Sequence, residues 1–166
     1  NAGGFGLRNF SIRGYENFKG LETRGKKEYD HVVKTKPHII IIEIIDATDE
    51  DEQAGRKTQA NGKIPGTNKY AQVKDFKKKK KYKFGSMEYS LESVGIRSTN
   101  YAHICALLTL NKKDYMFDGE NLKNPIYRND WKKLLNKNQN FKITPGISET
   151  YNFTKSYQCL VYFRTK

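Results

Sequence analysis

The chain has 166 residues, a formal net charge of +13 at pH 7, and 13% aromatic residues. This length suits one domain with a real hydrophobic core, and the aromatic content excludes a disordered composition. The charge favours an anionic partner or surface, and the alternative is an ordinary domain with a solvated basic exterior.

The beginning of the chain is predicted to be an irregular arm that precedes the main domain. Residues 1–36 mix glycines, charges and aromatic residues, so we interpret them as an N-terminal arm or partial subdomain, and residues 37–166 as a β-rich domain. Residues 37–45, PHIIIIEII, contain consecutive β-branched residues, which favour a central strand that is apolar on both faces. An acidic turn at 46–52 and a polar loop at 55–69 follow.

A basic loop is predicted at residues 74–84, KDFKKKKKYKF. Lysines interleaved with aromatic residues can bind nucleic acid, because ammonium groups contact phosphates and rings stack on bases. The alternative is a lysine run that solvates a loop or pairs with the acidic residues at 46–52. The candidate nucleic-acid-binding residues are Lys77, Lys78, Lys79, Lys80, Lys81 and Tyr82.

The second half of the chain is predicted to consist mainly of strands. Residues 87–96 read as a strand that places Leu91 and Ser93 on one face and Val94 and Ile96 on the other. The further elements expected after residue 118 are a short helix at 129–135, a short strand at 141–143 and a terminal strand at 157–164.

A β-hairpin is predicted over residues 104–117, with a four-residue polar turn at 111–114. His103 opens its first strand and Asp118 closes its second, so the hairpin could bring both side chains to the same region of the sheet. An imidazole beside a buried carboxylate is a common way to orient a general base. The alternative is a core hairpin with a solvated histidine and aspartate at its rim.

The chain has two cysteines, Cys105 and Cys159, and both lie in apolar runs. This fits buried, reduced thiols in an intracellular, reducing compartment better than a disulfide framework. Cys105 follows His103 by two residues on one strand, which separates their Cβ atoms by about 6–7 Å, too far for a thiolate–imidazolium pair without distortion. Cys159 lies in a predicted strand and does not open a helix. We therefore expect both cysteines to be core residues. We find no metal-ligand spacing and expect no metal or cofactor, and no apolar run is long enough to span a membrane.

Five segments, in this order, resemble the C-terminal half of the ubiquitin-specific proteases, which are papain-like deubiquitinases. The likeness covers roughly residues 37–164 and is carried by PHIIII at 37–42, YSLESV at 89–94, AHICA at 102–106, YMFD at 115–118 and SYQCLVYFR at 156–164. The resemblance implies an α+β fold of the papain-like cysteine-protease type, mainly antiparallel sheet with a few short helices.

The resemblance also implies that His103 is the catalytic general base and that Asp118 orients it. The family's nucleophilic cysteine lies upstream in a Gly-Asn-x-Cys box that this sequence lacks, and Ala102 replaces the glycine that precedes the family's histidine. We therefore expect a domain that is inactive as it stands and acts as a protein-interaction or structural module, with a ubiquitin-like protein or a peptide tail as partner. Two alternatives stay open: an active deubiquitinase fragment whose cysteine lies on a missing segment, and a basic nucleic-acid-binding or viral assembly subunit.

Overall fold

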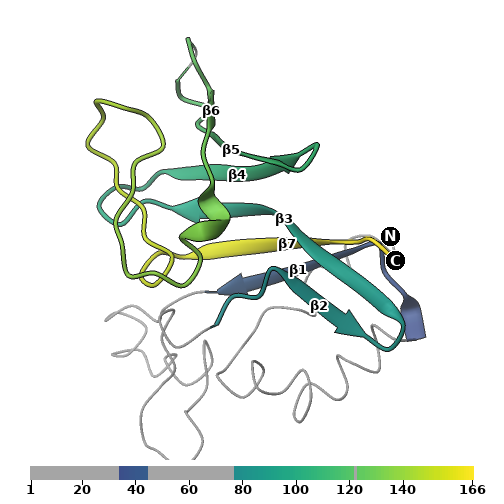
Figure 1. The fold of residues 1–166 in the computed structure, drawn as a ribbon. Helices are drawn as coiled ribbons and strands as arrows, with labels where there is room; N and C mark the ends of the chain where they lie inside the picture. The colour runs from purple at the N-terminus through teal and green to yellow at the C-terminus, as the bar shows by residue number, and fades with distance from the viewer. Residues whose placement is uncertain (1–33, 45–76, 122) are drawn as a thin grey trace, which may run out of the picture.

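A computed structural model describes residues 34–44, 77–121 and 123–166. These residues form one antiparallel β-sheet (Figure 1). In these residues the strand order is β1-β7-β3-β4-β5-β6, and β2 pairs with the first part of β3. The strands are β1 (Ile39–Ile44), β2 (Lys81–Phe84), β3 (Met87–Arg97), β4 (Ile104–Leu110), β5 (Lys113–Phe117), β6 (Ile126–Arg128) and β7 (Gln158–Arg164).

Several segments predicted from the sequence lie outside these ranges. They are the acidic turn at 46–52, the polar loop at 55–69 and nearly all of the arm over 1–36. In the part of the chain that the structure describes, no helix is long and apolar enough to cross a membrane.

The predicted α+β, papain-like fold is wrong, because the described residues contain almost no helix. Helical conformation is limited there to residues 34–35 and one 3-10 turn, η2 (Trp131–Lys133), where a longer helix was expected over 129–135. The side chain of Asp130 makes no capping hydrogen bond, and a segment of seven residues is too short to hold a helix by its own backbone bonds. Burial of the Trp131 ring instead fixes the segment as a turn against the sheet.

The strand β1 forms where the β-branched run predicts it, but it is not central among the strands that the structure describes. In that part of the chain it lies at one end of the strand order and pairs with β7. Ile40, Ile42 and Ile44 are buried, whereas Ile39 is 39% exposed, so the strand buries one face more deeply than the other.

A β-bulge in β3 corrects the predicted assignment of its faces. The pairing of β3 with β7 shifts register between Leu91 and Ser93, so one extra residue enters the strand. The side chains of Val94 and Ile96 therefore return to the buried face that Tyr89 and Leu91 occupy, instead of the opposite face. This single irregularity gives the sheet one continuous apolar face.

The hairpin of β4 and β5 is confirmed, with a tighter turn than expected. Leu110 pairs directly with Lys113, which leaves two turn residues instead of four. Asn111 and Lys112 have φ angles of 50° and 62°, as a type I′ hairpin turn requires. The strands therefore extend to the turn, and their other ends bring residue 103 and residue 118 to the same edge of the hairpin.

Residues 129–157 lie at one end of the sheet (Figure 1), and their buried side chains join its apolar core. Aromatic rings from this segment stack on one another, with ring centroids 6.4 Å apart for Trp131 and Phe153 and 5.5 Å apart for Phe141 and Phe153. The indole N–H of Trp131 donates to the carbonyl of Leu108 in β4, which ties the layer to the sheet. The same layer carries Tyr151 to the edge where the hairpin ends.

Candidate functional site

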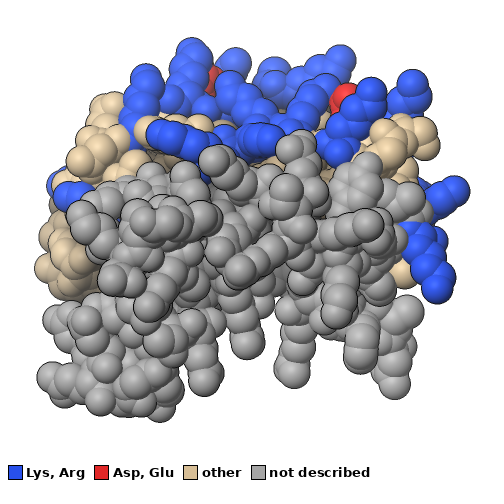
Figure 2. All heavy atoms as spheres, turned by 90° about the horizontal axis from the view of Figure 1, so that it is seen from below, with Lys and Arg blue, Asp and Glu red and all other residues tan. Residues whose placement is uncertain are grey.

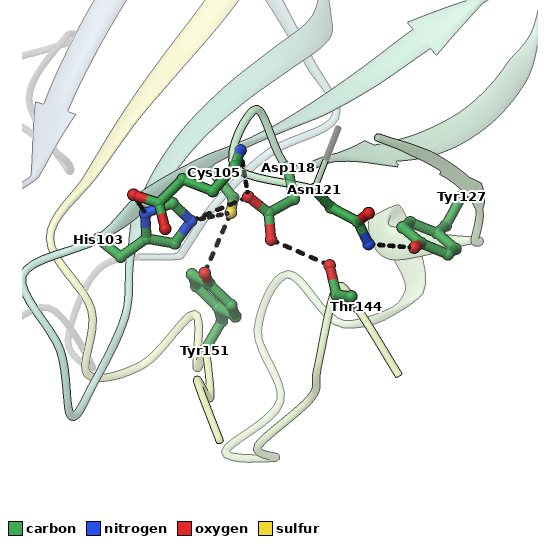
Figure 3. A network of polar contacts seen from close by, with 8 residues as sticks. His103, Cys105, Asp118, Asn121, Tyr127, Thr144 and Tyr151 are labelled. Carbon is green, nitrogen blue, oxygen red and sulfur yellow. Dashed lines mark hydrogen bonds and ion pairs between the residues drawn. The ribbon is translucent and has the colours of Figure 1, made fainter. Parts of the chain in front are cut away.

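His103 and Asp118 are in contact at the open end of the β4–β5 hairpin (Figure 3). His103 precedes β4 and Asp118 follows β5, and Nε2 of the imidazole lies 3.0 Å from Oδ1 of the carboxylate. The histidine side chain is 15% exposed and the aspartate side chain 4% exposed. The pairing that the hairpin predicted is therefore present, and it is largely shielded from water.

The carboxylate of Asp118 is held by hydrogen bonds on both oxygens. The backbone N–H of Glu120 donates to Oδ1 at 3.1 Å, and the hydroxyl of Thr144 donates to Oδ2 at 2.9 Å. Burial acts to raise the pKa of Asp118, but these two hydrogen bonds and the contact with His103 outweigh it and hold the pKa below its ordinary value. Asp118 is therefore a fixed negative charge at neutral pH.

A second carboxylate faces the other nitrogen of the His103 ring. Oε1 of Glu120 lies 3.2 Å from Nδ1, while Nε2 faces Asp118. The ring is thus placed between two acidic groups, one buried and one exposed. Each contact is a hydrogen bond only if that nitrogen carries a hydrogen, so a ring with both nitrogens protonated satisfies both carboxylates.

The thiol of Cys105 lies in the same cluster, which the sequence did not predict. Its Sγ lies 3.2 Å from Nε2 of His103 and 3.0 Å from the hydroxyl oxygen of Tyr151. The inference that strand spacing keeps Cys105 away from the imidazole is wrong for the side-chain atoms, because residues two apart point to the same face and their side chains converge. The expected burial of Cys105 is confirmed, whereas Cys159 is half-buried.

The geometry of this cluster differs from that of a Cys–His–Asp protease. In such a relay one ring nitrogen takes the proton of the nucleophile and the other is held by the carboxylate. Here Nε2 of His103 contacts both Cys105 and Asp118. Burial raises the pKa of Cys105 to about 11, even though the hydrogen bond with Tyr151 lowers it, so the thiol is protonated at neutral pH. Cys105 is therefore poorly suited to be a nucleophile.

An open pocket of about 430 Å³ adjoins the His103–Asp118 pair. Three of its lining residues carry carboxylates and one carries an ammonium group, so the pocket is acidic. The lining residues are His103, Asp118, Glu120, Asn121, Lys123, Thr144, Ile147 and Glu149. The amide of Asn121 donates to the hydroxyl of Tyr127 (Figure 3), which fixes the loop that forms this part of the wall.

The predicted nucleic-acid-binding residues do not form one uniform surface. Lys77, Lys79, Lys80 and Lys81 are exposed, and the ammonium group of Lys81 pairs with Glu88 at 2.7 Å. Lys78 is buried, and its backbone N–H and C=O both bond with the side chain of Asn136.

Tyr82 is buried in the core, and its ring centroid lies 5.0 Å from that of Tyr162. Tyr82 is therefore not placed to stack on a base, contrary to the role predicted for it.

Basic side chains dominate the surface of the described residues. These residues include 20 Lys and Arg and 8 Asp and Glu, a formal charge of +12 (20 − 8). Figure 2 shows Lys and Arg side chains crowded along one side of the molecule with little acidic surface between them. Three of the eight carboxylates line the pocket, which makes it a local acidic site in a basic domain.

The fold and the site together define an antiparallel β-sheet domain with a buried His–Cys–Asp cluster beside an acidic pocket. No family model, curated protein or solved structure matches this chain. The resemblance to ubiquitin-specific proteases stays a prediction from short sequence segments.

Proposed function

We propose that this domain is a protein-interaction module that holds a lysine or arginine side chain of a partner polypeptide in the pocket beside His103 and Asp118. The observation that carries the proposal is that carboxylates from Asp118, Glu120 and Glu149 meet in one open pocket of a strongly basic domain. A carboxylate and a cationic side chain form charge-assisted hydrogen bonds, which fix orientation as well as add affinity. The net positive charge of the described residues favours a partner whose flanking residues are acidic.

The resemblance to ubiquitin-specific proteases supports the choice of this site. His103 and Asp118, the pair to which the resemblance assigns catalysis, both line the pocket. The resemblance also suggests the partner, a ubiquitin-like protein or a peptide tail. We further propose that the domain works in a reducing, intracellular compartment, because Cys105 is a buried thiol that forms no disulfide.

Fluorescence anisotropy with two labelled peptides tests the proposal. The peptides have the same length and acidic flanks, and differ only in one central residue, arginine or glutamine; ubiquitin is measured as a third ligand. We expect the arginine peptide to bind more tightly. Replacing Glu120 or Glu149 by Gln should weaken it by up to about fivefold each, since an exposed ion pair contributes about 0.2–1 kcal/mol.

Glu88→Gln is the matched control, because it makes the same chemical change at a carboxylate on β3 that pairs with Lys81 and does not line the pocket. It should leave the affinity unchanged. Equal binding of the arginine and glutamine peptides, or equal effects of Glu88→Gln and Glu149→Gln, would contradict the proposed function.

A second candidate is binding of nucleic acid to the basic surface, which the density of Lys and Arg side chains in Figure 2 favours. Binding to a DNA duplex should then weaken with salt. Replacing Lys77, Lys79 and Lys80 by Ala should reduce the logarithmic salt slope by about 0.9 for each phosphate that the variant no longer neutralises. Tyr82→Phe should have no effect, because the ring is buried. A salt slope that the three substitutions leave unchanged would exclude binding by these three lysines.

A further inference from the structure

We propose that His103, Cys105 and Asp118 form a binding site for a zinc ion. Three atoms of the kinds that ligate zinc, namely Nε2 of His103, Sγ of Cys105 and Oδ1 of Asp118, lie within 4.8 Å of one another. Cys105 and Asp118 are buried and His103 is half-buried, so water competes weakly for these positions. The site lies beside the pocket but does not depend on the peptide-binding function proposed above.

The spacing of the three atoms suits a tetrahedral ion. Zinc bonds of about 2.0–2.3 Å at tetrahedral angles place neighbouring ligand atoms about 3.3–3.7 Å apart. Nε2 of His103 lies 3.0 Å from Oδ1 of Asp118 and 3.2 Å from Sγ of Cys105. These two pairs therefore need to separate by only a few tenths of an ångström, and Sγ of Cys105 lies within 4.8 Å of a carboxylate oxygen of Asp118.

The surroundings orient each ligand as metal sites commonly do. A histidine that ligates a metal usually donates its other ring N–H to a carboxylate, and Glu120 Oε1 lies 3.2 Å from Nδ1 of His103. Thr144 donates to Oδ2 of Asp118, which leaves Oδ1 as the oxygen turned towards the imidazole. Tyr151 lies within hydrogen-bonding distance of Cys105 Sγ and helps to fix the position of the thiol (Figure 3).

The charges of the cluster balance when zinc binds. Zinc forms one bond with the thiolate of Cys105 and one with the carboxylate of Asp118. These two negative charges together neutralise the doubly charged ion. The S–H bond of Cys105 breaks and its proton leaves to solvent, as does any hydrogen on Nε2 of His103, since that nitrogen binds the metal through its lone pair. The ion thus replaces the protons that otherwise separate these donors, and no oxidant or reductant is needed.

Three protein ligands leave one position of a tetrahedral ion for water or for a donor from a bound partner. His103 and Asp118 both line the pocket of about 430 Å³, so this position is reached from the pocket.

Titration of the reduced full chain with Co²⁺, followed by displacement with Zn²⁺, tests the site. Cobalt bound to a thiolate gives a sulfur-to-metal charge-transfer band, and its d–d bands report a tetrahedral site. We expect about one metal ion per chain, confirmed by elemental analysis of zinc. Cys105→Ser should abolish the charge-transfer band, and Asp118→Asn should keep the band with weaker affinity. Glu120→Gln should weaken binding by about tenfold or more, as loss of a carboxylate behind a metal-bound histidine commonly does.

Cys159→Ser is the matched control, since it removes the other thiol, which lies on β7 away from His103, and it should bind cobalt as the original chain does. Circular dichroism of each variant without metal shows that loss of the band is not loss of the fold. Absence of a charge-transfer band in the folded original chain would overturn the proposal, and so would an equally strong band in Cys105→Ser. Because the probe is the metal alone, failure of peptide binding would leave this result unaffected.

Discussion

Replacing Thr144 by Val tests whether the Asp118 carboxylate is held as the structure indicates. Valine keeps the shape of threonine and removes the hydroxyl that donates to Oδ2 at 2.9 Å. Thr144 and Asp118 are both buried, so water cannot easily replace the missing hydrogen bond. A hydrogen bond to a charged group contributes about 1.5–3 kcal/mol, so we expect the free energy of unfolding at neutral pH to fall by about 2 kcal/mol.

The loss of stability should depend on pH in a defined direction. Hydrogen bonds lower the pKa of Asp118 in the folded state, so the ionised carboxylate stabilises the fold above the pKa of the unfolded chain. This contribution disappears as the pH falls through the lower, folded-state pKa. A loss of about 2 kcal/mol would raise the folded-state pKa in the variant by about 1.5 units. The difference between the two proteins should therefore be complete at neutral pH and shrink as the pH falls through their folded-state pKa values.

Urea denaturation at a series of pH values measures this difference, with the slope of the transition checked for a change in the unfolded state. Thr109→Val is the control, because Thr109 donates to Asp114 at 2.7 Å in the same chemical pairing, but at a half-buried position. We expect it to cost less than about 1 kcal/mol. Equal costs for the two variants, or a Thr144→Val effect independent of pH, would refute the reasoning.

Three further predictions concern the hairpin and the cluster. Lys112→Gly should raise the free energy of unfolding by about 0.5–1 kcal/mol in urea, because a lysine at φ 62° is strained where glycine is not; a decrease would contradict the I′ turn. Burial raises the pKa of Cys105 to about 11. At about pH 8, iodoacetamide should therefore alkylate Cys105 more than about a hundredfold more slowly in the folded chain than in the unfolded chain. Equal alkylation rates, measured by peptide mass spectrometry, would disprove this. His103→Ala should weaken binding of the arginine peptide more than it lowers stability, whereas Leu107→Ala, at a fully buried position, should cost about 2–5 kcal/mol; equal losses of stability would contradict a binding role.

Local sequence patterns predicted the strands well and their arrangement poorly. The apolar run of β4, the hairpin and the terminal strand β7 all form, because each is a period-two or continuous apolar segment bounded by polar residues. The bulge between Leu91 and Ser93 and the position of β1 at one end of the sheet depend on which strands pair, which no single segment encodes. The resemblance to a papain-like fold failed for the same reason, since its short motifs describe strands and not the helices that such a fold also needs.

The candidate site was predictable where it depends on the hairpin alone. His103 and Asp118 flank paired strands, so the register places them at the same end of the hairpin, where their side chains meet. The same register could have predicted that Cys105 belongs to the site, because Cys105 lies one step beyond the paired residues of β4 and β5, next to Asp118. The Cβ spacing alone did not show how closely its side chain approaches the imidazole. Thr144 and Tyr151 come from the irregular layer at 129–157, whose course no periodic pattern predicts.

Mapping by NMR on the ¹⁵N-labelled chain tests whether the arginine peptide binds in the pocket. The proposed function predicts that the arginine peptide shifts backbone amides around Asp118, Glu120 and Glu149, and that the glutamine peptide shifts them much less at the same concentration. Shifts that instead gather at the exposed lysines of residues 77–81, and that are the same for both peptides, would contradict it and would assign binding to the basic surface.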